Sequence, residues 1–314
     1  MNVQDELARI SLQSPTALTI GVFDGVHKGH QYLLQRLRDA ATRNNYQTVV
    51  VTFMNHPRTV LSHGFGVSYI TTITERIKML RACGADHVVP ITFTHELSLL
   101  TPRTFVRLLC RFLQMKNMVV GPDFALGRNR RGAVPVLHKL GQEMGFIVET
   151  IELLRKNECV VSSTSIREAL SHGNIEAVMG YLGRPFRLVG PVERGSGRGK
   201  NIGFPTINVR VMPEQLLPPD GVYATWVFAD NRWCRSATNI GVRPTFGDGK
   251  RVVESFIMDF EGDLYDQNII LDFAGRLRGE EKFPNIDALT DQMNQDVEHA
   301  HHVLQSVKPG QIWG

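Results

Sequence analysis

The sequence is poor in cysteine, with four in 314 residues and none arranged as a CxxC pair. Zinc-binding domains and disulfide-stapled secreted domains need closely spaced cysteines, so both classes are excluded. No apolar run reaches the roughly 18 residues that span a membrane. The first ten residues contain no apolar stretch of the kind that a signal peptide requires. These absences predict a soluble, cytoplasmic protein with free thiols and no membrane partner.

The chain also lacks a strong charge of one sign. Its formal net charge is +4 and its pI is near 8.9, which favours anionic ligands without indicating a nucleic-acid binder. No internal repeat or low-complexity tract is visible. Because domains average about 150 residues, a chain of 314 residues with 42% apolar residues predicts two domains with real cores.

The first half alternates between short apolar runs and amphipathic segments. The apolar runs predict strands at residues 16–21, 47–53, 87–93 and 117–121, and the amphipathic segments predict helices at 30–43, 74–84, 101–113 and 134–145. Continuous apolar strands separated by helices are typical of a doubly wound α/β fold, a parallel sheet with helices on both faces. In such folds ligands bind at the carboxyl ends of the strands.

The pattern changes in the second half. Residues 221–241 predict a hairpin around Asp230 and Asn231, and further strands are expected at 252–260 and 268–273. One helix is expected at 286–305. Strands followed by one helix predict a small antiparallel barrel or sandwich with the helix packed on it. We place the domain boundary between residues 182 and 183.

The stretch GVFDGVHKGH, residues 21–30, follows the first predicted strand. His27 and His30 are three apart, so both belong to the first turn of the next helix. Free backbone N–H groups at a helix start attract anions, and Gly29 allows a close approach to the backbone. The pattern fits phosphate binding, and it also fits a histidine pair that caps a helix beside a tight turn.

A second segment, SSTSIREAL at residues 162–170, carries hydroxyl side chains before a predicted helix. Ser163 and Thr164 are typical of a helix start, and Arg167 follows one turn later. The segment is either an ordinary capped helix or a pyrophosphate clamp.

A glycine-rich basic loop opens the second half. Residues 190–209 hold Gly197, Gly199 and Gly203 around Lys200, without either standard nucleotide fingerprint. Such a loop can turn N–H groups toward an anion. It can equally be a flexible basic loop or an RNA-binding patch, although single-strand binders usually interleave aromatic residues.

Three polar residues after this loop are candidates for metal binding and proton transfer. Thr206 and Asn208 lie two apart, so an extended segment puts both on one side, where their oxygens suit Mg²⁺. Glu254 interrupts an apolar strand, so it either faces solvent or serves as a base.

Four segments of the first half, in order, resemble the adenylyltransferase half of bacterial bifunctional riboflavin kinase/FAD synthetases. They are GVFDGVHKGH, TFMNHPR at 52–58, GPDFALGRNRRG at 121–132, and SSTSIREAL. The resemblance implies a Rossmann-like nucleotidyltransferase fold, with His27, His30 and Arg167 stabilising the phosphates during catalysis. It further implies ATP contacts at Gly21, Phe23, Asp24, Gly25, Gly29, Ser163 and Thr164, and flavin contacts at His56, Pro57, Asp123 and Phe124.

The second half resembles the riboflavin kinase module of the same family. The matching segments are GRGKNIGFPTINV at 197–209, GVYATWV at 221–227, NIGVRPTF at 239–246 and VVESFIMDFEGDLYDQ at 252–267. The resemblance implies a small antiparallel β-barrel in which Thr206 and Asn208 hold Mg²⁺ and Glu254 takes a proton from the flavin hydroxyl. It also implies ATP contacts at Gly197, Gly199, Lys200, Gly203 and Thr206, and flavin contacts at Arg278 and Phe283 in a loop that covers the flavin.

The chain departs from the family pattern at three positions. The family commonly has asparagine at Val22, proline at Asn55 and histidine at Phe256. These changes remove no expected phosphate ligand, but they bear on flavin affinity and orientation.

The resemblance implies an enzyme that makes FMN from riboflavin and ATP, and then FAD from FMN and ATP, both steps with Mg²⁺. Its partners would be these small molecules and the apoproteins that take up FMN and FAD, with no nucleic acid; no oligomeric state follows from the sequence. Two alternatives stay open. One is a riboflavin kinase with a reduced or altered adenylyltransferase domain, and the other is a non-catalytic flavin- or RNA-binding protein.

Overall fold

The computed structural model describes residues 2–62, 66–152, 155–156, 159–195, 199, 202–242 and 251–311. By residue contacts the chain divides into two compact units, Met1–Ser162 and Ser163–Ile312. The helices α8 (Ser163–Ser171) and α9 (Ile175–Leu182) group with the second unit. Their grouping has a structural reason, because α9 packs against α8 and against two strands of the second unit.

The first unit is built on a parallel sheet with the strand order β3-β2-β1-β4-β7. Its strands are β1 (Thr16–Gly21), β2 (Gln47–Phe53), β3 (His87–Ile91), β4 (Met115–Val120) and β7 (Ile147–Thr150). The four predicted strands are confirmed, and the short edge strand β7 was missed. The strand order reverses between β1 and β4, so the carboxyl ends of these strands form the switch point where such sheets bind ligands.

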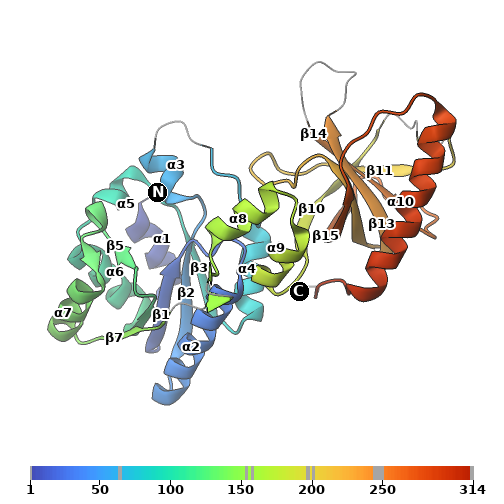
Figure 1. Cartoon of the computed structure of the whole chain (residues 1–314). Helices are drawn as coiled ribbons and strands as arrows, with labels where there is room; N and C mark the ends of the chain where they lie inside the picture. Colours follow the sequence, from blue (N-terminus) through green and yellow to red (C-terminus); the bar gives the residue numbers. More distant parts are fainter. Residues whose placement is uncertain are drawn as a thin grey trace. The chain divides into compact units, whose positions relative to one another are not determined.

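Helices cover both faces of this sheet, as predicted (Figure 1). The long helices are α1 (Val3–Ile10), α2 (Lys28–Asn44), α4 (Ile73–Ala82), α6 (Pro102–Leu113) and α7 (Val134–Met144). The shorter elements are α3 (Pro57–Leu61), α5 (His95–Leu99), η1 (Arg128–Arg130) and the strand pairs β5 (Ala125–Leu126) with β6 (Gly132–Ala133) and β8 (Arg155–Lys156) with β9 (Cys159–Val160). Thr72 and Thr101 cap α4 and α6, where their hydroxyls accept backbone N–H groups.

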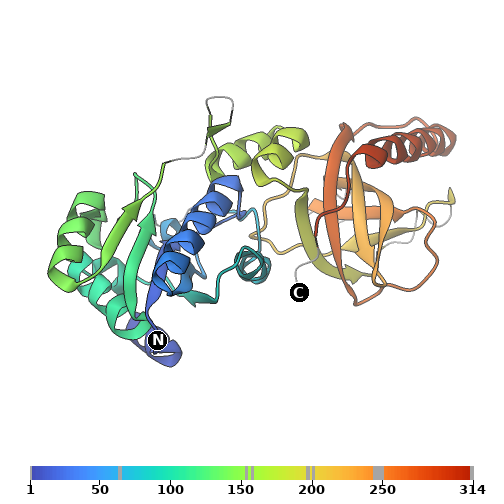
Figure 2. The same ribbon diagram turned by 90° about the horizontal axis from the view of Figure 1, so that it is seen from below.

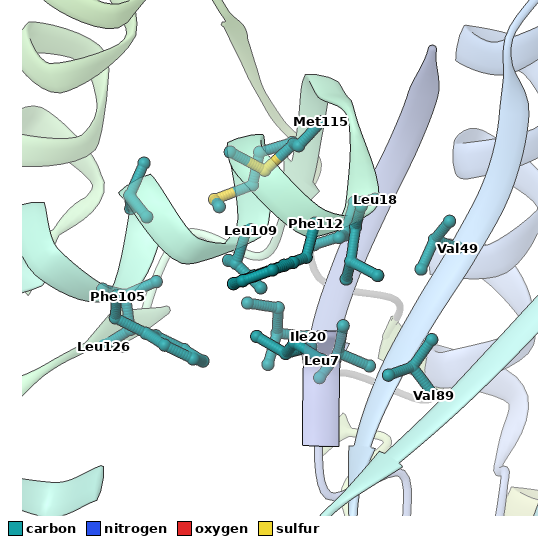
Figure 3. Packing of buried hydrophobic residues seen from close by; sticks show 14 of the residues in the cluster. Leu7, Leu18, Ile20, Val49, Val89, Phe105, Leu109, Phe112, Met115 and Leu126 are labelled. Carbon is teal, nitrogen blue, oxygen red and sulfur yellow. The ribbon is translucent and has the colours of Figure 1, made fainter. Parts of the chain in front are cut away.

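Alternate residues of the strands enter two separate cores. On one face, Leu18 and Ile20 of β1 pack with Leu7 of α1 and with Leu109 and Phe112 of α6 (Figure 3). On the other face, β1 contributes Ala17 to a cluster formed with α2 and α4. A strand buried on both faces explains why the apolar runs of the first half are continuous.

The second unit contains a closed antiparallel barrel with the strand order β10-β11-β14-β13-β12-β15. Its strands are β10 (Phe186–Glu193), β11 (Thr206–Val209), β12 (Gly221–Ala229), β13 (Arg232–Val242), β14 (Arg251–Ile257) and β15 (Asn268–Arg278). The predicted hairpin is confirmed between β12 and β13, with Asp230 at φ 48° and Asn231 at φ 57°. Two residues of positive φ match the two-residue turn that suits a twisted hairpin.

The last helix, α10 (Ile286–Ser306), lies along the outside of the barrel (Figure 2). Ala300 and Leu304 of α10 pack against Ala224 of β12 and Ala274 of β15. The predicted barrel and its helix are thus both present. In the part of the chain that the structure describes, no helix is long and apolar enough to cross a bilayer.

Candidate active sites

The turn after β1 has an unusual backbone. Phe23 and Val26 adopt positive φ values of 53° and 39°, and Gly25 lies at 83°. Bulky residues rarely adopt this conformation, which costs about 1–3 kcal/mol per residue, and such strain clusters at functional loops. Phe23 and Val26 are both buried, so packing holds the turn in place.

Asp24 anchors this turn from within. Its carboxylate is 1% exposed and accepts hydrogen bonds from the backbone N–H groups of Ile70 (3.0 Å) and Thr71 (3.1 Å). Arg76 lies 3.8 Å away and balances the charge. The side chain of Asp24 therefore holds the turn in place. Asp24 and Phe23 were predicted to contact ATP, and with their side chains buried they would contribute by maintaining the turn.

His27 and His30 lie together at the start of α2. Their rings stack with centroids 3.6 Å apart, and Nδ1 of His27 accepts the backbone N–H of His30 at 3.3 Å. The helix-capping interpretation is thus observed for His27. Among the described residues, the buried Nδ1 of His30 has no hydrogen-bond partner. A buried polar atom without a protein partner is the kind of atom that a ligand satisfies.

The pKa of His30 is held well below its usual value, first by burial and then by the nearby His27 and Arg76. His30 is therefore neutral near pH 7 in the free protein, because its usual pKa is about 6.5. His27 and Arg76 disfavour a positive charge on His30. The negative charge of a bound polyphosphate would offset this effect.

Acidification is expected to destabilise the first unit through His30. Because the folded pKa lies below the unfolded one, the unfolded chain binds more protons between the two values. The free energy of unfolding should fall as the pH drops below about 6.5, by up to about 1.4 kcal/mol per pH unit. Denaturant unfolding at pH 7.5 and 5.5 tests this, and His30→Gln should lose less free energy than the wild type. Equal losses would contradict the prediction.

Gly29, next in this helix start, leaves little space for a side chain. A Cβ there would lie 3.0 Å from the backbone oxygen of Val161 and 3.1 Å from the ring of His27. Ser163 follows Val161 two residues later in the chain and begins α8. Ser163, Thr164 and Arg167 belong to the second unit, so their predicted role as a phosphate clamp with the histidines stays a prediction.

A pocket of about 830 Å³ lies in the first unit at the carboxyl ends of β1, β2 and β3. Its lining includes the predicted residues Gly21, His56, Pro57 and Phe124 and the departure Val22. Asp123 is exposed and is not part of the lining.

Sequence reasoning missed the aromatic walls of this pocket, which are formed by Phe53, Phe93 and Phe105 together with Phe124. Phe53 and Phe93 pack edge to face with ring centroids 5.4 Å apart. Both lie at or just after the carboxyl end of a parallel strand. Because ligands bind at these ends in such sheets, the two residues could have been predicted from the sequence. Aromatic walls suit a flat ring such as a flavin.

A second group of residues meets on the outer face of the barrel. In the strand register, Glu254 of β14 lies opposite Asn208 of β11 on one side and Asn239 of β13 on the other. Thr206 lies opposite Phe256. Directly opposite residues in antiparallel strands bring their Cβ atoms within about 5.5 Å. The barrel thus gathers Thr206, Asn208 and Glu254 on one face, as the predicted magnesium and base sites require.

A pocket of about 630 Å³ lies beside this face, between the barrel, α10 and residues 278–283, and Asn208 is not part of its lining. Glu254, Thr206 and Phe256 line it, together with Arg278 and Phe283. Glu254 is half-buried, because the outer face of the barrel is covered at this point. Strand alternation alone favoured solvent, and the covering helix and loop turn that outward position into a pocket wall.

The side chain of Arg278 is fixed within this pocket. Its Nε and Nη2 donate to the carboxylate of Asp296 on α10, at 2.9 Å and 2.7 Å, and its guanidinium lies over the ring of Phe283. Two predicted flavin contacts are therefore brought together. Sequence reasoning missed the pocket residues Asn239 and Asp296, although Asn239 begins the matching segment NIGVRPTF.

The glycine loop is described only in part. Gly199 lines the pocket, and a Cβ there would lie 2.2 Å from the backbone oxygen of Phe204, so the loop needs glycine at this position. Gly203 adopts φ 86°, which also favours glycine. The predictions for Gly197 and Lys200 lie outside the described residues.

Comparisons with known proteins identify a family for each half of the chain. The model of the FAD synthetase family matches residues 9–165, and that of the riboflavin kinase family matches residues 182–304. A crystal structure of a Streptococcus pneumoniae protein named as a macrolide-efflux protein matches with a TM-score of 0.86 and 28% identity, over 94% of this chain and 96% of that chain.

Curated relatives align over nearly the whole chain. The bifunctional riboflavin kinase/FMN adenylyltransferase of Escherichia coli K12 is 33% identical over 95% of both chains. The protein of the same name from Pseudomonas fluorescens is 36% identical over 89% of this chain and 90% of its own. With two family matches in the same order as the two pockets, the chain belongs to the family of bifunctional riboflavin kinase/FMN adenylyltransferases.

Proposed function

We propose that this enzyme phosphorylates riboflavin to FMN with ATP and then adenylylates FMN to FAD with a second ATP, releasing pyrophosphate. The kinase reaction takes place at the barrel pocket and the adenylyl transfer at the carboxyl edge of the parallel sheet. The observation that carries this assignment is that Glu254 lines the barrel pocket and lies opposite Asn208 in the strand register, in a unit separate from the paired histidines. A flavin- or RNA-binding protein without catalysis has no need of a carboxylate in that position.

In the kinase reaction Glu254 acts as the general base. Its carboxylate takes the proton of the riboflavin 5′-hydroxyl as that oxygen attacks the γ-phosphorus of ATP, and ADP leaves. Gly199 and Gly203 shape the loop that binds the ATP phosphates, with Gly197 and Lys200 predicted beside them. Arg278 and Phe283 cover the flavin.

The donor atoms on this face fit a magnesium ion. The Thr206 hydroxyl and the Asn208 amide oxygen are hard ligands on one side of β11, next to the Glu254 position. A bound Mg²⁺ would neutralise charge on the phosphates. Thr206 and Asn208 would hold it, and Glu254 stays available for the proton.

In the adenylyl transfer an FMN phosphate oxygen attacks the α-phosphorus of ATP, and pyrophosphate leaves. His27, His30 and the free N–H groups at the start of α2 stabilise the negative charge that develops. Gly21, Gly25 and Gly29 allow the phosphates close to the backbone, and Asp24 and Phe23 maintain the turn. Ser163, Thr164 and Arg167 supply further phosphate contacts.

The flavin ring of FMN occupies the pocket with aromatic walls. His56, Pro57 and Phe124 line it, and Asp123 would contribute from its edge. Residues 1–182 would serve as the adenylyltransferase domain and residues 183–314 as the kinase domain. Since both reactions consume ATP, we place the enzyme in the cytoplasm, where apoproteins take up FMN and FAD.

A time course tests the proposed function. The pure protein is incubated with riboflavin, ATP and Mg²⁺, and the three flavins are separated by chromatography. FMN should rise first and then give way to FAD, and chelation with EDTA should stop both steps. FMN that accumulates without FAD, even when FMN is supplied directly, would restrict the function to the kinase. The absence of any product would favour a binding protein.

A further inference from the structure

Asn55 joins two segments that border the first pocket. Strands β2 and β3 pair in parallel up to Phe53 and Ile91, where both end. Beyond that point the Oδ1 of Asn55 accepts the backbone N–H of Phe93 at 2.8 Å, and its Nδ2 donates to the backbone oxygen of Phe93 at 2.9 Å. The side-chain amide of Asn55 thus continues the hydrogen bonding between the two segments after the strands end.

Both segments contribute to the lining of the pocket. His56, Pro57 and Arg58, which follow Asn55 directly, line it from one segment, and Phe93 lines it from the other. The ring of Phe93 rests edge to face on Phe53, so its position depends on where its backbone is held. Asn55 therefore links the two lining segments through its side chain, and it does not itself line the pocket.

Only an amide of this length can make both bonds. Asparagine offers one acceptor oxygen and an N–H donor side by side, which matches the N–H and C=O of one residue. Aspartate would accept the N–H of Phe93 but would place its second oxygen against the carbonyl oxygen. Alanine would make neither bond and would leave both backbone groups of Phe93 without this partner.

We propose that Asn55 is a positioning residue for the adenylyl transfer: it holds Phe93 in place and thereby sets the affinity for the flavin ring of FMN. The inference rests on the proposed adenylyltransferase function.

The test compares Asn55→Ala and Asn55→Asp with the wild type in FAD formation from FMN and ATP. We expect the KM for FMN to rise about 5- to 20-fold in Asn55→Ala, which loses both hydrogen bonds, and by a smaller factor in Asn55→Asp, which keeps one of them. The KM for ATP should change less than about twofold. The phosphorylation of riboflavin, which the barrel performs, should keep its wild-type rate. A general loss of folding would lower both activities or change both KM values together.

Thr92→Val provides a matched control in the same segment. The hydroxyl of Thr92 donates to Glu6 at 2.7 Å, and Thr92 does not line the pocket. The control should keep the wild-type KM for FMN. An equal rise in Thr92→Val, or an unchanged KM for FMN in Asn55→Ala, would overturn the inference while leaving the proposed function intact. A wild type that forms no FAD would overturn the function, and the inference with it.

Discussion

Glu254→Gln is expected to abolish the phosphorylation of riboflavin while leaving FAD formation from supplied FMN intact. Glutamine has nearly the same shape, so the barrel should fold, but a neutral amide cannot accept the hydroxyl proton. Loss of a general base typically lowers the rate by about 10²–10⁴. The measurement is the initial rate of FMN formation at saturating riboflavin and ATP. FAD formation from supplied FMN is measured in the same preparation.

Glu261→Gln is the matched control for this prediction. Glu261 is an exposed glutamate of the same unit and is not part of the pocket lining, so the same chemical change should leave both activities unchanged. Glu254→Gln with wild-type kinase activity would remove the role assigned to Glu254. A variant that loses both activities would indicate misfolding, which thermal unfolding would detect.

His30→Ala is expected to impair FAD formation and to leave the phosphorylation of riboflavin intact. FAD formation from FMN should fall by about 10²–10³, the usual cost of one lost donor at a site where negative charge develops. The reason lies at the start of α2, where His30 stacks on His27 and keeps a buried Nδ1 without a partner in the described chain. The kinase rate should not change, because the barrel belongs to the other unit. Both rates are followed by chromatography of the flavins.

His138→Ala is the control for the histidine. His138 is exposed on α7 of the same unit, and its loss should not change either rate. His30→Gln keeps a side-chain donor and should recover part of the activity. Full FAD formation in a folded His30→Ala would show that the histidine pair serves only to cap the helix.

The regular elements were predictable because each is a local property of the chain. Strands β1 and β2 have the bounds that the apolar runs indicated, and the helix predicted at 101–113 is α6. The misses have physical causes. Strand β7 is short and lies at the sheet edge, and α3 has five residues, so neither has enough length for a clear period.

The histidine pair was also readable from spacing, because residues three apart in a helix start must lie close together. The environment of the side chains in this turn could not be predicted from spacing. Asp24 is buried against residues 70–71, far away in sequence, and the pKa of His30 is lowered first by burial and then by His27 and Arg76. No local pattern records such a contact.

By itself, the sequence determined the order of the elements, the two different halves, the histidine pair at a helix start and the family resemblance. These features follow from hydrophobic periodicity, turn residues and short motifs, which are local properties of the chain. Only the tertiary structure decided that Glu254 lines a covered pocket and that Asn55 ties Phe93 to the neighbouring strand. Both outcomes depend on which distant segments pack together, and that choice is made by closure of the barrel and pairing of the sheet.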